Sequence, residues 1–284
     1  MRIGYFGDVM GRSGRQGLAA RLPELRARLG LDFVVANAEN AAGGFGITEA
    51  TANELYDAGV DCITLGNHAW DQREALSYIE REPRLLRPAN YPLGCGAPGK
   101  GANLYETADG RRVLVVLTMG RLFMDALDCP FAAVERELAA CPLGEGADAV
   151  IVDVHAEASS EKYAMGHFCD GRASLVIGSH THVPTADWQV LPHGTAYQTD
   201  AGMCGDYDSV VGMAKEIPLQ KFTTRIPAGR GTPAEGPATV CGVFVETVDA
   251  TGLARCILPI REGGVLDQSA PNLGDLAPRA DAAE

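Results

Sequence analysis

Short apolar runs alternate with longer amphipathic stretches through the first third of the chain. The runs have the length of buried strands, and between residues 18 and 29 leucines recur at helical spacing. Thr48 stands where the N-cap of a second helix is expected. The pattern predicts strands at residues 2–7, 33–36 and 61–65, and helices at 15–29, at 48–58 and from Asp71 onward. This alternation of strand and helix predicts an α/β fold with a layered βαβ sheet.

The rest of the chain adds strands, hairpins and fewer helices. We expect buried strands at 149–154 and 175–177, hairpins pairing 103–107 with 113–117 and 187–191 with 195–199, closing strands at 239–246 and 254–259, and helices at 130–140, 161–168 and 212–222. Residues 87–101 are rich in Gly and Pro and predict an irregular segment. No linker divides this pattern, so residues 1–262 are expected to form one domain. Residues 263–284, rich in Pro, Ala, Asp and Gly, are expected to be a disordered tail.

Composition and charge narrow the possible functions. With 24 basic and 37 acidic residues the net charge is −13, which disfavours binding to bulk nucleic acid or to anionic membranes. No apolar run approaches the roughly 18 residues that a membrane span needs. The eight cysteines form no C-x-x-C pair, and the chain starts directly with a strand instead of a signal peptide. We therefore expect a protein of the reducing cytoplasm.

Polar side chains of metal-binding types follow the predicted strands. They are Asp8, Glu39, Asn40, Asn67, His68, His155, His180 and His182, each placed after an apolar run. Open α/β sheets bind ligands at the carboxyl ends of their strands, so these residues are expected to meet there. Oxygen and nitrogen ligands without a thiol suit Mn, Fe or Zn better than Ca. The set is too large for one metal and would suit two metals about 3.5–4 Å apart that share a bridging carboxylate.

Five of these residues also have an ordinary structural explanation. Asp8 could cap the following helix, Asn67 could belong to a simple turn, and His155 could be a hydrogen-bonded core histidine. His180 and His182, separated by one residue, could lie at the surface by accident. The joint pattern favours a metal site, because every one of these explanations would have to place a ligand-type residue at a strand end independently.

Two nucleotide-binding motifs are present only in part. Residues Gly94–Lys100 fit G-x-x-x-x-G-K, but Gly101 stands where a P-loop needs Ser or Thr, and a strand is expected next. Residues Gly7–Gly14 have the glycine-rich form of a dinucleotide site with the wrong spacing, and Asp8 would repel a pyrophosphate. Neither segment supports a nucleotide cofactor.

The chain resembles the calcineurin-like metallophosphoesterase superfamily. The resemblance rests on Gly7-Asp8, Gly66-Asn67-His68 and Gly178-Ser-His180-Thr-His182. Two departures are the absence of an early Asp-x-His, since Asp8 is followed by Val9 and Met10, and Glu39 in place of a bridging Asp. Both departures, together with Arg87-Pro-Ala-Asn90, His155-Ala-Glu157-Ala-Ser and Asp170-Gly-Arg172-Ala-Ser, are similar to the YmdB-like bacterial group. The resemblance covers residues 1 to about 260 and implies a layered α/β-β-α sandwich.

The resemblance also implies roles for the residues. One metal would be held by Asp8, Glu39, Asn40 and His182, and a second by Glu39, Asn67, His155 and His180. The ions would be divalent or trivalent, Fe or Mn, with Zn as a further candidate. Hydroxide held between the metals would attack phosphorus, and His68 would act as general acid. The alternative for His68 is a supporting role, in which it orients the ligand Asn67.

The implied activity is hydrolysis of small phosphodiesters such as 2′,3′-cyclic nucleotides, by a homo-oligomer. Two alternatives are a phosphomonoesterase and a metal-binding regulatory protein with weak catalysis. The segments 91–101 and 203–212 are candidates for covering the substrate, because of their loop-like composition.

Overall fold

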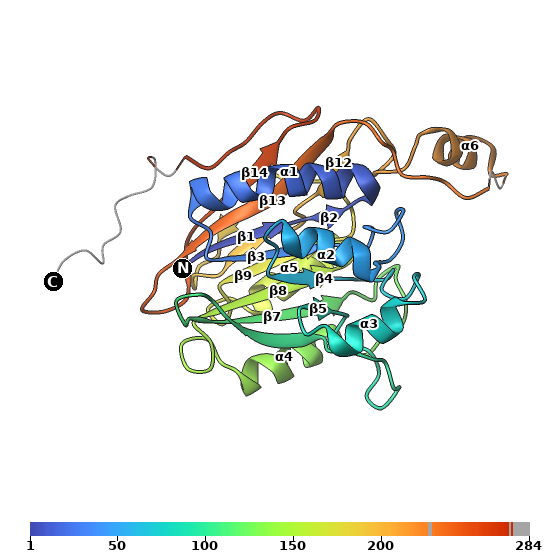
Figure 1. Ribbon diagram of the computed structural model, residues 1–284. Helices are drawn as coiled ribbons and strands as arrows, with labels where there is room; N and C mark the ends of the chain where they lie inside the picture. The colour runs from blue at the N-terminus through green and yellow to red at the C-terminus, as the bar shows by residue number, and fades with distance from the viewer. Residues whose placement is uncertain (227–228, 273, 275–284) are drawn as a thin grey trace.

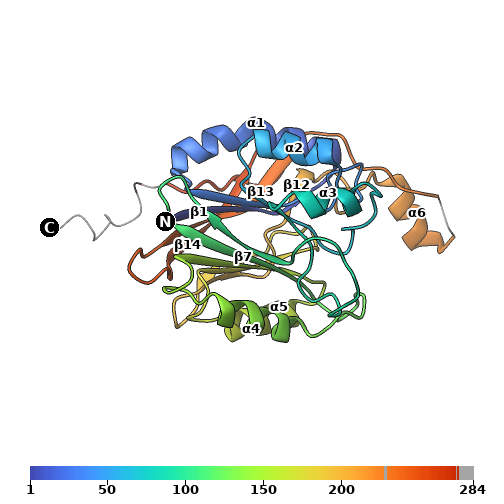
Figure 2. The same ribbon diagram turned by 60° about the horizontal axis from the view of Figure 1, so that its bottom comes forward.

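Two β-sheets lie face to face between layers of helices. The computed structural model describes residues 1–226, 229–272 and 274. Figure 1 shows the arrangement of the elements, and in Figure 2 helices α1 (Gly11–Leu29) and α2 (Glu49–Asp57) cover one sheet while α4 (Pro130–Ala140) and α5 (Ser159–Phe168) cover the other. The expected α/β-β-α sandwich is therefore confirmed.

The first sheet combines parallel strands with an antiparallel half. Its strands, in spatial order, are β2 (Asp8–Val9), β12 (Met203–Asp206), β13 (Ala238–Thr247), β1 (Arg2–Phe6), β3 (Phe33–Asn37), β4 (Cys62–Thr64) and β5 (Leu85–Leu86), and β14 (Ala254–Glu262) pairs with β13. Strands β1, β3, β4 and β5 are parallel to one another, whereas β13 is antiparallel to β1. The three strands predicted near the amino terminus thus end at the same edge of this sheet.

The second sheet contains a parallel centre between two hairpins. Its order is β10 (Gln189–Val190), β11 (Ala196–Gln198), β9 (Leu175–Ser179), β8 (Ala149–His155), β7 (Arg112–Met119) and β6 (Ala102–Glu106). Strands β7, β8 and β9 are parallel, and both predicted hairpins, β6–β7 and β10–β11, are present. The carboxyl ends of β8 and β9 therefore lie together.

The side chains of β8 alternate between two clusters of the hydrophobic core. Val150, Val152 and Val154 belong to a cluster with residues of α4 and α5, whereas Ile151 belongs to the larger cluster that fills the space between the sheets and under α1. Because strand residues alternate between faces, Asp153 and His155 share the inter-sheet side with Ile151. A carboxylate and an imidazole thus lie between the sheets.

A local sequence signal explains where one helix begins. Thr48 caps α2 through a capping box with Thr51, as expected. Helix α1 begins at Gly11 instead of residue 15, because its first turns pack small residues, and a Cβ on Gly14 would lie 2.2 Å from the Cys204 carbonyl oxygen. The leucine periodicity starts only at residue 18 and cannot reveal this part of the helix.

Other boundaries differ from the predictions. Helix α3 (Ala75–Arg81) begins four residues after the predicted Asp71, and α6 spans Glu216–Thr224 instead of 212–222. The two-residue strands β2 and β5 and the strand β12 were not predicted, since runs this short carry no periodicity.

The remaining expectations concern the carboxyl-terminal segment, membranes and cysteines. Within the predicted tail, Ser269 exchanges backbone hydrogen bonds with Arg261 of β14, and residues 273 and 275–284 lie outside the described part. The disorder expected for residues 263–284 therefore stays a prediction. None of the helices in the described ranges has the length and apolarity needed to cross a membrane. All eight cysteines lie in those ranges and are free thiols.

Candidate metal centre

The predicted polar residues gather where the two sheets present their strand ends. Asp8, Glu39 and Asn67 follow β1, β3 and β4 of the first sheet, while His155 ends β8 and His180 follows β9 of the second. The side chains of Asp8, Glu39 and His155 are almost completely buried. The site is therefore built across the sandwich, with candidate ligands from both sheets.

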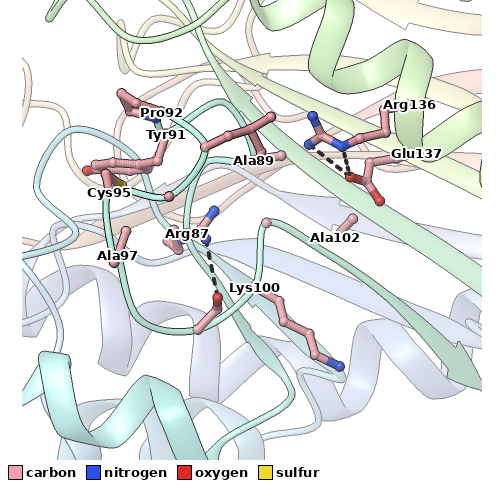
Figure 3. Close-up of a pocket in the computed structure, with 15 residues that line it drawn as sticks. Arg87, Ala89, Tyr91, Pro92, Cys95, Ala97, Lys100, Ala102, Arg136 and Glu137 are labelled. Atoms are coloured by element: carbon pink, nitrogen blue, oxygen red, sulfur yellow. Dashed lines mark hydrogen bonds and ion pairs between the residues drawn. The ribbon is translucent and has the colours of Figure 1, made fainter.

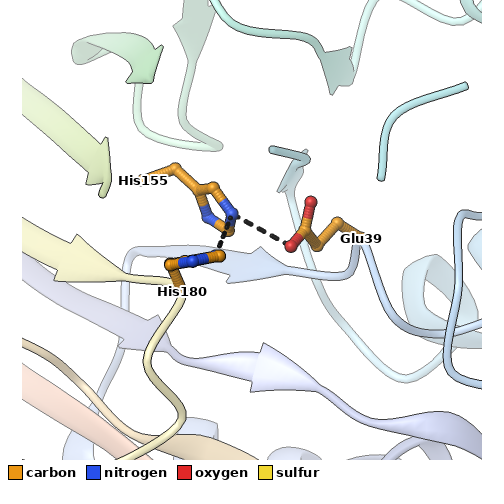
Figure 4. A group of neighbouring side chains, drawn as sticks. All are labelled: Glu39, His155 and His180. Carbon is orange, nitrogen blue, oxygen red and sulfur yellow. Dashed lines mark hydrogen bonds and ion pairs between the residues drawn. The ribbon is translucent and has the colours of Figure 1, made fainter. Parts of the chain in front are cut away.

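The first group of ligand atoms converges on one ring nitrogen. His155 Nε2 lies 2.9 Å from Glu39 Oε1, 2.9 Å from Asn67 Oδ1 and 3.1 Å from His180 Nδ1. Figure 4 shows the rings of His155 and His180 and the Glu39 carboxylate directed toward one another. This group has the composition that the resemblance implied for the second metal.

A second group lies beside it. His182 Nε2 is 3.2 Å from Asn40 Oδ1 and 3.7 Å from Asp8 Oδ1. A hydrogen bond to the backbone orients each side chain. Asn40 Nδ2 donates to the Gly44 carbonyl, and His182 Nδ1 donates to the Val211 carbonyl. The oxygen of Asn40 and the Nε2 of His182 therefore face Asp8.

Asp8 presents a buried oxygen without a hydrogen-bond partner. Its Oδ2 accepts the backbone N–H of His180 at 3.1 Å, but Oδ1 has no hydrogen-bond donor among the described residues. A buried carboxylate oxygen without a donor is costly. A cation at this position would satisfy it.

The side-chain charges shift several pKa values. Burial raises the pKa of Asp8 to about 6, partly offset by the nearby His182 and His155. Burial also acts to raise the pKa of Glu39, but the attraction of His155 outweighs it and holds the pKa at about 2. Burial acts to lower the pKa of His155, yet Glu39 raises it to about 9, while burial and the His155 charge lower the pKa of His180 to about 3. Among the protein groups alone, one positive charge thus sits between carboxylates, in the place a cation would take.

A hydroxyl network beneath the site orients His155. Ser179 Oγ donates to Asp153 Oδ1 at 2.7 Å and lies 3.0 Å from His155 Nδ1. Since the Ser179 proton is used on Asp153, its oxygen accepts the proton of Nδ1, so that the neutral imidazole, with a cation in place of the Nε2 proton, would offer its lone pair at Nε2. Asp153 Oδ2 also accepts from Tyr5 and Thr64 at 2.7 and 2.6 Å.

A glycine makes room for the same ring. A Cβ on Gly66 would lie 2.3 Å from His155 Cδ2 and Nε2, closer than any side chain allows. Gly66 precedes Asn67, so the β4 strand end can approach the ring closely enough for the Asn67 amide to reach its Nε2.

Comparison with known proteins shows the family of this chain. Residues 5–260 match the model of the family described as YmdB-like protein. The chain belongs to the YmdB-like family. It is 44% identical over 251 residues to a 2′,3′-cyclic-nucleotide 2′-phosphodiesterase of Bacillus subtilis (strain 168), covering 88% of this chain and 93% of the relative.

Solved structures agree with this membership. A hypothetical protein from Thermus thermophilus has a TM-score of 0.85 at 44% identity, covering 93% of this chain and 100% of the other. A structure described as a novel phosphatase from Mycoplasma pneumoniae has a TM-score of 0.86 at 30% identity, covering 95% of each chain. The protein is thus a YmdB-like enzyme of the metallophosphoesterase type, as the motifs predicted.

Membership in this metallophosphoesterase family implies divalent metal ions, and the residues fit them. Glu39, His155 and His180 each offer a ligand atom within 4.8 Å of the others. The buried Asp8 Oδ1 and the inward-facing Asn40 Oδ1 add oxygens of the type that Mn, Fe and Zn accept.

His68 contacts the ligand groups through its backbone, whereas its ring is held by other residues. Its backbone N–H donates to Glu39 Oε2 at 2.8 Å, and its ring Nδ1 lies 2.8 Å from Asp71 Oδ2. Phe45 contacts the ring edge on, with centroids 5.2 Å apart, and the side chain is 28% exposed. Among the described residues no hydrogen bond joins the ring to Asn67, so the orienting role considered for His68 has no contact to support it.

Sequence reasoning missed the residues behind the ligands. Asp153 lies within the predicted strand 149–154 and was not among the candidates. A carboxylate between Val152 and Val154 is a signal that a buried strand carries a polar partner. Asn37, the last residue of β3, was not among the candidates, yet its Oδ1 accepts the N–H of Glu39 at 3.1 Å. Ser179 carried no such signal.

The two candidate covering segments lie in different surroundings. Residues 91–97 and 99–101 line a cavity of about 340 Å³ together with Arg87 and Arg136, shown in Figure 3. Tyr91 of this segment accepts a hydrogen bond from Trp70 Nε1 at 2.8 Å. In the segment 203–212, the Val211 carbonyl contacts the ring of His182. Whether either segment covers a substrate stays a prediction.

Proposed function

We propose that this YmdB-like enzyme is a dinuclear metal-dependent phosphodiesterase that hydrolyses small phosphodiesters, with 2′,3′-cyclic nucleotides as the leading substrates. The observation that carries the proposal is the pair of ligand groups, one around His155 Nε2 and one around Asp8 Oδ1, which lie side by side at the strand ends. The substrate class comes from the Bacillus subtilis relative.

The proposed ligand sets follow these groups. Asp8, Asn40 and His182 would hold one ion, Asn67, His155 and His180 the other, and Glu39 would bridge them. Bound metals of this type act as Lewis acids on the phosphoryl oxygens and on the attacking water. The protein's own contribution is to hold the ligands rigidly on strand ends and to exclude water from their buried side.

The geometry around His68 supports the role of general acid. Asp71 accepts from Nδ1 and thereby fixes the ring, so that the second nitrogen, Nε2, points away from Asp71. In that orientation the imidazolium form of the ring would donate its Nε2 proton to the departing ribose oxygen and become the neutral imidazole, a contribution typically worth ~10²–10⁴-fold in rate. His68 also fixes Glu39 through its backbone, so a substitution that changes only its side chain separates the two functions.

One experiment tests both parts. The metals in the purified protein are counted, and 2′,3′-cyclic AMP, bis-p-nitrophenyl phosphate and p-nitrophenyl phosphate are assayed side by side. Two metals per chain and turnover of the diesters are expected. Faster turnover of the monoester would favour the phosphomonoesterase alternative, with which the relative described as a phosphatase agrees.

The chain offers a matched control for the acid. His193 is also paired with a carboxylate, its Nδ1 lying 3.0 Å from Asp170 Oδ2, but it belongs to the β10–β11 turn. We expect His68→Ala to lose ~10²–10⁴-fold in kcat with both metals retained, and His193→Ala to keep wild-type turnover. Metal loss in His68→Ala would assign His68 a structural role. A wild-type protein that binds no metal and gains no activity from added Mn, Fe or Zn would refute the proposal.

Three further expectations complete the proposal. Iron or manganese is expected as the native metal from the family resemblance, with zinc as a further candidate, because oxygen and imidazole ligands suit all three. The free thiols favour a reducing compartment such as the cytoplasm. A homo-oligomer is implied by the family resemblance and is tested by light scattering of the purified protein.

A further inference from the structure

A buried ion pair lies directly under the turn that carries His180 and His182. Lys162 on α5 donates to Asp200 Oδ2 at 2.7 Å, and each side chain is only 1% exposed. Removing two charges from water is costly, and a buried pair is a poor device for stability alone. Neither residue belongs to the ligand groups, so the pair needs another explanation.

The Asp200 carboxylate holds the residue between the two histidines. Its Oδ2 accepts both the backbone N–H of Thr181 at 3.1 Å and the Thr181 hydroxyl at 2.8 Å. Its Oδ1 accepts the N–H of Gly202 at 2.9 Å. Thr181 is thereby fixed by main chain and side chain to one buried carboxylate, whose charge Lys162 balances.

The turn that is held in this way is strained. His180 has φ 96° and His182 has φ 65°, both in the left-handed region that non-glycine residues rarely adopt. Such conformations persist only where the surroundings over-determine them, and they cluster at functional sites. Relaxation of either residue toward negative φ would turn its ring away from its ligand group.

We infer that Lys162, Asp200 and Thr181 form a positioning clamp that directs the two imidazoles of one short turn to two different ligand groups. With the clamp in place, His180 Nδ1 faces His155 and His182 Nε2 faces Asn40. The inference rests on the proposed dinuclear function. It adds the contacts that keep His180 directed to one ligand group and His182 to the other. Lys162, Asp200 and Thr181 are positioning residues, because they act through the histidines.

Substitutions at Thr181 test the clamp with little change in shape. Thr181→Val removes the hydroxyl and keeps the volume, whereas Thr181→Ser keeps the hydroxyl. Thr195→Val is the matched control, since the buried Thr195 hydroxyl contacts the Cys169 and Ala173 carbonyls and has no bond to the histidine turn. The double variant Lys162→Met/Asp200→Asn removes both charges together and leaves no isolated buried charge.

The readouts are metal affinity, the visible absorption of the Co²⁺-substituted protein, and kcat and KM for bis-p-nitrophenyl phosphate. Metal-stripped protein is titrated with Mn²⁺ by calorimetry. We expect Thr181→Val and the double variant to lose ~10–100-fold in affinity for at least one metal, with an altered Co²⁺ spectrum and a fall in kcat larger than any change in KM. Thr181→Ser is expected to recover affinity and spectrum, and Thr195→Val to keep them.

The outcomes separate this inference from the proposed function. If the wild-type protein fails to bind two metals or to hydrolyse a phosphodiester, the proposed function fails. If the wild type does both, and the folded Thr181→Val and double variants bind Mn²⁺ as tightly as the wild type with the same Co²⁺ spectrum, the clamp is overturned. A lowered melting temperature alone, shared with Thr195→Val, also counts against it.

Discussion

Replacing Ser179 by alanine removes the single oxygen between Asp153 and His155. That oxygen donates to Asp153 at 2.7 Å and accepts from His155 Nδ1 at 3.0 Å. Without it, the polar atom that remains near Nδ1 is Asn37 Nδ2 at 3.4 Å, which is itself a donor. The ring then favours the tautomer with the proton on Nε2, the nitrogen on which the ligand group converges.

The magnitude follows from the bonds that are lost. Loss of a partner behind a ligating histidine typically weakens metal binding ~10–100-fold, which corresponds to about 1.4–2.7 kcal/mol. The Asp153 carboxylate keeps Tyr5 and Thr64 as donors. The free energy of unfolding is therefore expected to decrease by only ~1.5–3 kcal/mol, the contribution of one hydrogen bond to a charged group. We therefore expect a folded protein with a melting temperature lower by roughly 3–12 °C.

The assay compares Ser179→Ala with Ser174→Ala. Ser174 is equally buried just before the same strand, donates to the Gly252 carbonyl and accepts the N–H of Val150, but it lies at the opposite end of β9. Mn²⁺ titration of the metal-stripped proteins measures affinity, and nitrogen NMR shifts of the imidazole report the tautomer. Weakened binding is expected in Ser179→Ala alone. Equal affinity in all three proteins, or equal weakening in both variants, would refute the tautomer argument.

Three further predictions concern space, pH and metal removal. Gly66→Ala is expected to displace the His155 ring, since the added Cβ would lie 2.3 Å from it, and calorimetry should find at least one Mn²⁺ lost; unchanged stoichiometry would contradict this. Burial acts to raise the pKa of Asp170, but hydrogen bonds from His193 outweigh it and lower the pKa below 3.8. This carboxylate therefore stabilises the fold above pH 3.8, and its contribution is lost as the pH falls through the lowered pKa. Urea unfolding should therefore find Asp170→Asn less stable at pH 7, with a difference that shrinks toward pH 3; a constant difference would exclude this linkage. Chelation of the metals should lower the unfolding free energy by about 2.7 kcal/mol for each site, relative to protein with free metal at 100-fold its dissociation constant. Thermal unfolding measures this difference, and an unchanged curve would argue against metals as part of the native fold.

The candidate ligand residues were predictable because their placement is local. Asp8, Glu39, Asn67, His155 and His180 each follow an apolar run that forms a strand by its own composition. Parallel strands present their carboxyl ends at one edge, so the residues after them converge without further information. The strand positions and the type of site thus follow from patterns of a few residues.

The supporting residues were not predictable, because their roles depend on contacts between distant segments. Asp153 and Ser179 are 26 positions apart, and Lys162 and Asp200 are 38 apart. In the sequence, Lys162 stands beside Glu161 on α5, and nothing marks it as buried. The left-handed backbone of the histidine turn has no sequence signal either, since neither residue is glycine.

The sequence by itself therefore determined the order of the longer strands and the helices, the family, and a set of side chains of metal-binding types at strand ends. The family resemblance implied how that set divides, but only the tertiary structure brings each group together, because the grouping depends on the two sheets facing each other and on the turn after β9. His180 joins the group around His155, whereas His182, two positions later, joins Asp8. The physical reason is that burial, strain and hydrogen bonding are settled by the whole fold, whereas strand formation and polarity are properties of short segments.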